Sequence, residues 1–199
     1  IPKIAEQSID RWISSNYNAD QICPTRTNLQ ILKIAPVKPK IYSFFRTPEW
    51  NTIKSIKTIG YIFSVQGQPN ERIVSFYFYL KKEAQRRKLK SENETLSAGL
   101  EMALLPINQY FENEDQNKRL FIDNHYNNFY SYYFASGSYN GFQRYGEKKR
   151  LSYAKLLSLA IEMISSDYDE IFNMQTIDEL PKVLARKFDF KGGKLKKIN

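Results

Sequence analysis

Residues 118–150 read KRLFIDNHYNNFYSYYFASGSYNGFQRYGEKKR, and this aromatic stretch decides which fold the sequence predicts. Basic residues frame it at both ends, and its middle contains Asp123 and the only histidine of the chain, His125. Large flat rings are typical of a half-buried sheet, and rings on its exposed face can stack on nucleic-acid bases. One sheet can serve both purposes, because successive side chains point to opposite faces. The rings are Phe121, Tyr126, Phe129, Tyr130, Tyr132, Tyr133, Phe134, Tyr139, Phe142 and Tyr145.

The aromatic stretch predicts three strands. They cover residues 119–123, 127–136 and 142–145, and the loop at 137–141 makes the last two a hairpin. The preceding segment, residues 112–118, is polar and predicts a loop.

A second hairpin is predicted upstream of the aromatic stretch. Apolar and polar residues alternate over 60–66, and residues 67–71 supply turn residues at a usual hairpin loop length. The other arm, residues 72–80, is apolar on both faces, which predicts a central strand covered on both sides.

The rest of the chain predicts helices, with two further strands near the N-terminus. Apolar residues recur at helical spacing in several segments, some of which begin with capping residues or proline. A capping box is predicted at 91–94 and another at Thr176 and Glu179. The predicted helices are 5–17, 47–59, 81–90, 94–107 with a bend or end at Pro106, 152–164 capped by Ser152, and 180–188, and the strands are 28–35 and 41–46.

This order of elements predicts an α+β fold. A mixed or antiparallel sheet with hairpins would be packed by several helices, and the C-terminal part would be helical. We expect one globular domain over residues 1–190, followed by a basic Gly/Lys tail over 191–199.

The net charge of +9 is concentrated in two segments. Residues 81–90, KKEAQRRKLK, carry a net charge of +5, and residues 181–199 carry +6. Such blocks are typical of a protein that binds a polyanion. They are also typical of a solvated helix face and a charged tail, and the sequence leaves both interpretations open.

The lengths of apolar runs and the number of cysteines predict where the protein is located. No run of about 18 apolar residues occurs, so no membrane span is expected. The single cysteine, Cys23, cannot form an internal disulfide and leaves no set of ligands for structural zinc. We therefore expect a cytoplasmic protein without a cofactor.

Basic and aromatic residues together predict a nucleic-acid interface. Lys82, Arg86 and Lys90 are four residues apart, so they share one face of the predicted helix. Cations would neutralise phosphates and tyrosines would stack on bases. The candidates are Lys82, Arg86, Arg87, Lys88, Lys90, Arg144, Lys148, Lys149 and Arg150 for phosphates, and Tyr126, Tyr130, Tyr132 and Tyr139 for stacking.

A carboxylate pattern suggests a nuclease instead. Asp123 ends an apolar segment, and Glu147 and Lys149 follow in the form D…(D/E)xK, which resembles the loose pattern of the PD-(D/E)xK nucleases. The resemblance implies Mg²⁺ held by Asp123 and Glu147, with Lys149 near the attacking water. No proline precedes Asp123, and Glu147 lies in a polar stretch.

The histidine offers a third interpretation. Arg119 and His125 are six residues apart, an R-x5-H arrangement that resembles the one in the helical HEPN ribonucleases. The resemblance implies an acid/base role for His125 and requires both residues in a helical bundle. The strand predicted at 119–123 departs from that requirement, and an ordinary turn residue is the alternative for His125.

No catalytic signature in the sequence is specific. We therefore predict a non-catalytic nucleic-acid-binding protein that acts as a subunit of a nucleoprotein assembly. A Mg²⁺-dependent nuclease is one alternative. A protein-interaction subunit without nucleic-acid contact is the other, because aromatic residues and arginine are enriched in protein interfaces.

Overall fold

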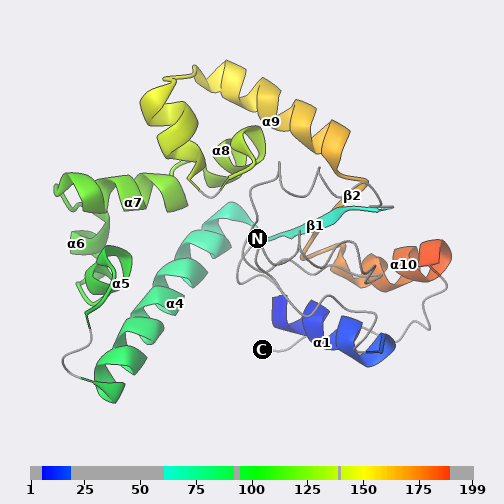
Figure 1. Ribbon diagram of the computed structural model, residues 1–199, viewed down its shortest axis with the longest axis horizontal. Coiled ribbons are helices and arrows are strands. Elements are labelled where there is room, and N and C mark those ends of the chain that lie inside the picture. The colour runs from blue at the N-terminus through cyan, green and yellow to red at the C-terminus, as the bar shows by residue number, and fades with distance from the viewer. Residues whose placement is uncertain (1–5, 19–60, 92–94, 139, 189–199) are drawn as a thin grey trace. The chain divides into compact units, whose positions relative to one another are not determined.

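The computed structural model describes residues 6–18, 61–91, 95–138 and 140–188 (Figure 1). The chain divides into two compact units. The terminal unit combines residues 1–68 with 164–199, and the central unit comprises residues 69–163. The single domain predicted over 1–190 includes both units and stays a prediction.

The terminal unit contains a two-stranded parallel sheet, in which β1 pairs with β2 so that Phe63 lies opposite Glu170. Parallel strands need a long crossover, and here the crossover contains the whole central unit. The core residues include Trp12 and Phe172. The elements are α1 (Glu6–Asn16), β1 (Phe63–Gln66), β2 (Glu170–Asn173), the 3-10 helix η4 (Ile177–Glu179) and α10 (Leu180–Phe188).

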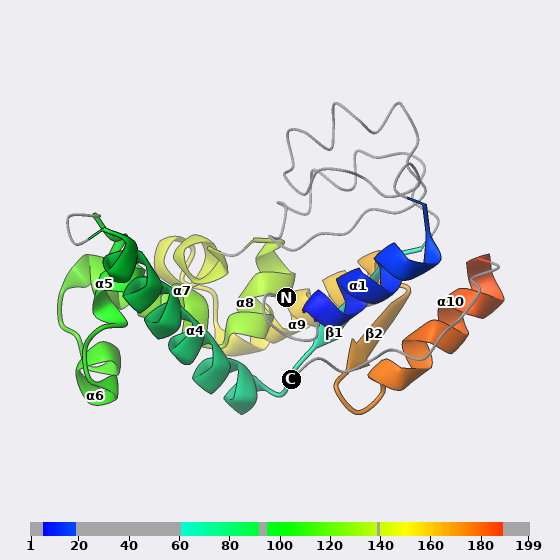
Figure 2. The same ribbon diagram turned by 90° about the horizontal axis from the view of Figure 1, so that it is seen from below.

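In the described part of the central unit, every regular element is a helix. Figures 1 and 2 show α5 and α7 beside the long helix α4, and the core between them includes Tyr77, Tyr110 and Ile122. The last residues of α9 belong to the terminal unit. The elements are α4 (Pro69–Lys90), α5 (Ala98–Met102), α6 (Ile107–Phe111), α7 (Gln116–Tyr126), α8 (Phe129–Ser136), the π-helix η3 (Phe142–Lys148) and α9 (Tyr153–Asp167).

The hairpin predicted over residues 60–66 and 72–80 is wrong. Only its first arm contains a strand, β1, whereas the second arm lies inside the 22-residue helix α4. Pro69 stands at the first helical position, where its missing N–H is not needed, and Glu71 adds a carboxylate to the first turn. The buried residues of α4 follow a helical spacing: Arg72, Tyr77, Leu80 and Ala84.

The strands predicted in the aromatic stretch are also wrong. Residues 119–123, 127–136 and 142–145 contribute to α7, α8 and η3, respectively. The predicted loop at 112–118 contains the N-cap of α7, because the carboxylate of Asp115 accepts hydrogen bonds from the backbone N–H groups of Asn117 and Lys118, each at 3.0 Å. The polar residues before the aromatic stretch therefore start a helix.

Helix α8 contains the densest aromatic run. The rings of Phe129 and Tyr133, four residues apart, stack with centroids 5.6 Å apart, so two large side chains pack across one helical turn. The helix ends at Gly137, whose φ of 63° lies in the left-handed region and whose N–H donates to the carbonyl of Tyr133. The residues predicted to form a hairpin loop thus supply a helix C-cap.

The predicted α+β fold with a mixed or antiparallel sheet is therefore wrong. The described part of the chain is mostly helical, and its sheet is one parallel pair of strands. Runs that are apolar on both faces satisfy a strand and a helix equally well, so the tertiary contacts decided between them.

Several helix predictions are confirmed. These are α1, residues 81–90 as the end of α4, α9, and α10. The Oγ atom of Ser152 accepts a hydrogen bond from the N–H of Lys155 at the start of α9, as predicted.

Other helix predictions need correction or lie outside the described residues. The helix predicted at 94–107 is interrupted: α5 ends at Met102, and Pro106 is the N-cap of α6. The capping box of Thr176 and Glu179 is wrong, because Thr176 makes no side-chain cap bond and its Oγ1 accepts from the N–H of Asn173. The elements predicted at 28–35, 41–46 and 47–59, and most of the capping box at 91–94, lie outside the described residues.

No helix in the described segments is both long enough and apolar enough to cross a membrane.

Candidate functional site

The C-terminal half of α4 presents cations on one exposed face. Lys82, Arg86 and Lys90 succeed one another every four residues, and all three are exposed. A helix rises 1.5 Å per residue, so the three positions span about 12 Å along the axis. We call these three residues the basic stripe. Lys88 is exposed away from this line, and Arg87 is half-buried.

A single carboxylate organises the two arginines. Glu83 accepts two bonds from Arg86, at Nε (2.8 Å) and Nη2 (2.6 Å), and one from Nε of Arg87 at 2.9 Å. These bonds lower the pKa of the Glu83 carboxyl to about 2, so it is ionised near pH 7. A guanidinium group has five N–H donors, so an arginine that binds Glu83 retains the capacity to bind a phosphate as well.

Upstream of the basic stripe, α4 also exposes apolar side chains. Val74 and Phe78 precede Lys82 at four-residue spacing and are 53% and 56% exposed. Helix α4 thus exposes apolar side chains in its first half and basic side chains in its second. The sequence prediction missed this order of apolar and basic side chains, because it assigned residues 72–80 to a strand. A helix over residues 72–90 would have predicted it.

Two of the predicted stacking residues are packed inside the central unit. The hydroxyl groups of Tyr126 and Tyr110 lie 2.9 Å apart, and burial raises the pKa of Tyr126. The ring of Tyr132 packs edge-on against Phe142, with centroids 5.3 Å apart. Both side chains contribute to packing.

The other two stacking candidates have different positions. Tyr130 is half-buried, with its ring edge-on to Phe129. Tyr139 lies outside the described residues.

The second predicted group of cations lies on and after η3. Lys148, Lys149 and Arg150 are exposed, and Arg144 is half-buried. The Nζ atom of Lys149 lies 4.5 Å from the centroid of the Tyr145 ring. In Figure 1 this yellow segment lies far from the C-terminal end of α4, so the structure does not bring the two groups together.

The residues of the nuclease alternative lie on two elements, Asp123 on α7 and Glu147 and Lys149 at the end of η3. The carboxylate of Asp123 pairs with Arg119, and Glu147 and Lys149 are exposed on another element. Among the described residues, no group of three His, Cys, Asp or Glu side chains is placed to hold a metal ion. Asp123 also lies on a helix, whereas the sequence predicted the end of a strand.

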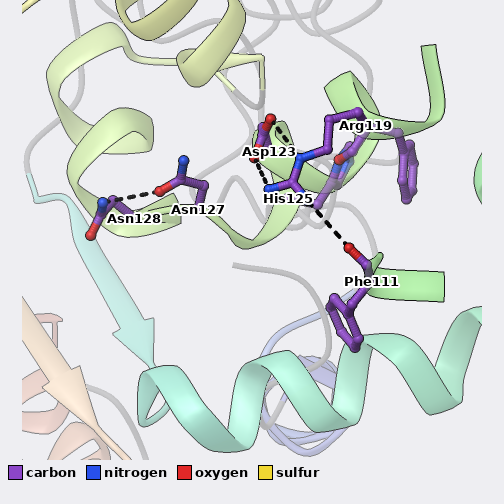
Figure 3. A network of polar contacts seen from close by, with 7 residues as sticks. Phe111, Arg119, Asp123, His125, Asn127 and Asn128 are labelled. Carbon is purple, nitrogen blue, oxygen red and sulfur yellow. Dashed lines mark hydrogen bonds and ion pairs between the residues drawn. The ribbon is translucent and has the colours of Figure 1, made fainter. Parts of the chain in front are cut away.

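The R-x5-H pair lies on one helix, α7, which the sequence prediction placed partly in a strand. Figure 3 shows its arrangement. Arg119 donates from Nε and Nη2 to Asp123, at 3.3 and 3.0 Å, and from Nη1 to the carbonyl of Phe111 at 3.2 Å. Six residues correspond to about 120° around a helix, so Arg119 and His125 do not share a face.

His125 is held inside the central unit. Its ring stacks on Phe121 at a centroid distance of 4.2 Å and on Phe76 at 5.4 Å. Its Nδ1 lies 2.9 Å from the carbonyl oxygen of Phe121. Burial lowers the pKa of His125 to about 4, so the imidazole is neutral near pH 7. These contacts are those of a packed core histidine.

A shallow pocket of about 480 Å³ opens beside the Arg119–Asp123 pair. Its lining is mainly apolar and includes Phe111 and Ile122. Because the two charged groups neutralise each other, the pocket carries no net charge that would select a charged ligand.

One important residue was missed by the sequence analysis. Arg72 is only 4% exposed, and its Nη1 donates to the carbonyl of His125. The signal in the sequence is an arginine at the start of the apolar run 72–80. An arginine in such surroundings needs partners, because arginine is almost never buried without them.

Comparison with known protein families, curated proteins and solved structures gave no significant match.

Proposed function

We propose that this protein binds nucleic acid without cleaving it, and that the basic stripe of α4 contacts the phosphates. The observation that carries the proposal is the position of Lys82, Arg86 and Lys90 on one exposed face of a continuous helix. Cations at regular spacing neutralise successive phosphates and release condensed counterions, which makes the binding strongly dependent on salt.

The surrounding charge supports this proposal. Residues 81–90 carry a net charge of +5 even with Glu83 ionised. The C-terminal end of a helix favours cations, so these side chains also suit their position on α4.

The test is binding of labelled single- and double-stranded DNA and RNA at two salt concentrations, with and without Mg²⁺, read by anisotropy and on a denaturing gel. The test variant is Lys82→Gln/Arg86→Gln/Lys90→Gln. The control is Lys148→Gln/Lys149→Gln/Arg150→Gln, which removes the same charge at another exposed place. We expect the test variant to bind more weakly and to lower the slope of log affinity against log salt by roughly 3, about one unit per phosphate contact.

Two results would contradict the proposal. Unchanged affinity and slope in the test variant would remove the basic stripe from the site. Equal losses in the test and control variants would mean that total charge, and not this face, governs the interaction.

The same gel tests the nuclease alternative. That function predicts strands shortened only with Mg²⁺, and cleavage lost in Asp123→Ala and in Glu147→Ala. Intact strands under all conditions agree with the non-catalytic proposal.

We further propose that the protein works in the cytoplasm as a subunit of a nucleoprotein assembly. Its single cysteine suits a reducing compartment. An apolar stripe on α9 supports the protein partner: Tyr153, Leu157 and Ile161 recur every four residues and are 58%, 40% and 56% exposed. Purification of the native assembly, with and without nuclease treatment, tests this. Recovery of the protein in a monomeric fraction in both cases would contradict it.

A further inference from the structure

We propose that the nucleic acid bound by α4 is single-stranded, and that the ring of Phe78 is the surface on which one of its bases stacks. This inference rests on the proposed function and names its class of ligand. It adds to the basic stripe an aromatic side chain that was not among the tyrosines predicted for stacking.

Phe78 lies beside the first cation of the basic stripe. Phe78 precedes Lys82 by four residues, so the two are neighbours on the helix surface, about 6 Å apart along the helix axis. A base on Phe78 would therefore have its own backbone beside Lys82. Single-strand binding sites combine these two elements, cations that follow the backbone and rings that stack on bases.

The ring of Phe78 is accessible on the surface of α4. Phe78 is 56% exposed, whereas its neighbour Tyr77 is 2% exposed. Among the described residues, Phe78 makes one ring contact, an edge-type contact with Tyr77, with centroids 5.2 Å apart and planes at 68°. By contrast, the ring of Tyr126 contacts Phe76, Tyr110 and Phe111.

The ring of Phe78 packs against a buried neighbour. The ring that Phe78 packs against is itself fixed, because the hydroxyl group of Tyr77 donates to the carbonyl of Leu105 at 3.2 Å. Tyr77 also packs against Tyr110, with centroids 5.0 Å apart. Phe78 is thus backed by a rigid core.

These features distinguish single strands from duplexes. In a duplex each base face is covered by the neighbouring base pair, so a ring beside the phosphate-binding cations has no base face to contact. In a single strand the bases can turn away from one another and stack on a side chain. Phe78 and Lys90 are about 18 Å apart along the helix axis, which is enough for several nucleotides.

The experiment compares a labelled single-stranded oligonucleotide with the matching duplex, using the full chain and fluorescence anisotropy at low salt. The variants are Phe78→Ala and Phe78→Tyr, and the control is Ile107→Ala, which truncates an equally exposed apolar residue on α6 (52% exposed). Circular dichroism verifies that each variant is folded. We expect Phe78→Ala to weaken single-strand binding about tenfold, Phe78→Tyr to retain it, and Ile107→Ala to leave it unchanged.

A Phe78→Trp variant gives a readout that does not depend on loss of affinity. Stacking of a base on the new indole would quench its fluorescence with the single strand and not with the duplex. The same titration of the unchanged protein corrects for its two native tryptophans.

The outcomes separate this inference from the proposed function. Salt-sensitive binding that is equal for single strand and duplex, or that is unchanged in Phe78→Ala, would overturn the role of Phe78. Neither result would contradict the binding of phosphates by the basic stripe. Equal weakening by Ile107→Ala would also overturn the role of Phe78. Absence of binding to either nucleic acid at low salt would contradict the proposed function itself and would point to a protein partner for this face of α4.

Discussion

The guanidinium carbon of Arg72 lies 3.5 Å from the centroid of the Phe129 ring, so the first turn of α4 packs directly against the first residue of α8. The same guanidinium donates from Nη1 to the carbonyl of His125 near the end of α7. One buried cation thus connects three helices. Its favourable position depends on the ring and the carbonyl, since a buried charge without such contacts would be strongly destabilising.

Replacement of Arg72 should destabilise the central unit. In Arg72→Ala the carbonyl of His125 loses a donor and Phe129 loses its cation, and we expect the free energy of unfolding to fall by roughly 2 kcal/mol or more. Urea denaturation followed by circular dichroism measures this. The exposed Arg11 of α1 is the control, since Arg11→Ala should change stability by less than about 0.5 kcal/mol. Equal effects of the two variants would contradict the connecting role.

His125 should make the protein less stable in mild acid. Because burial lowers its pKa to about 4, the unfolded chain binds a proton between roughly pH 6.5 and 4 that the folded chain does not. The contribution of His125 is therefore complete above pH 6.5 and is lost as the pH falls through this window, by up to about 1.4 kcal/mol per pH unit. In His125→Phe, which keeps a ring between Phe76 and Phe121, this part of the pH dependence should disappear. Identical slopes in the two proteins would show that His125 is accessible to protons in the folded state.

Glu83 should weaken the binding of a polyanion. Its carboxylate adds a negative charge to the basic stripe and holds Arg86 and Arg87. In Glu83→Gln the net charge of residues 81–90 rises from +5 to +6, so we expect tighter binding at low salt, by about two- to threefold, and a steeper salt dependence. A salt titration of both proteins measures it. Weaker binding by the variant would instead show that Glu83 holds the arginines in their binding positions.

The cap of α7 offers a test of the helical assignment. Asp115→Ala removes the acceptor for two backbone N–H groups, and we expect a loss of about 1 kcal/mol in the free energy of unfolding. The neighbouring Glu114 is exposed and provides a matched carboxylate, so Glu114→Ala should have little effect. If the segment were the predicted loop and strand, the two substitutions would be equivalent.

Amphipathic helices with clear polar faces were predictable from the sequence. The helix at α9 follows from its apolar residues at helical spacing after Ser152, and α10 follows from the same pattern. Residues 81–90 could be assigned because lysine, arginine, glutamate and alanine all favour a helix. The common face of Lys82, Arg86 and Lys90 then follows from their four-residue spacing alone.

The aromatic site residues were less predictable. Tyr126 and Phe78 are both aromatic side chains in apolar surroundings, and sequence pattern alone does not tell which of them is buried. The structure buries most of Tyr126 against Tyr110 and exposes Phe78, because α6 and α7 cover one face of α4 and leave the other.

By itself the sequence determined the helices with one polar face, the location of the positive charge and the common face of the basic stripe. These features depend on residues within a few positions of one another. Only the tertiary structure decided that residues 72–80 and 127–136 are helical, and which rings remain exposed. In such runs the apolar residues fit the period of a strand and that of a helix. Contacts between residues distant in the sequence, such as that between Arg72 and Phe129, therefore decided for the helix, because they bury one set of side chains and not another.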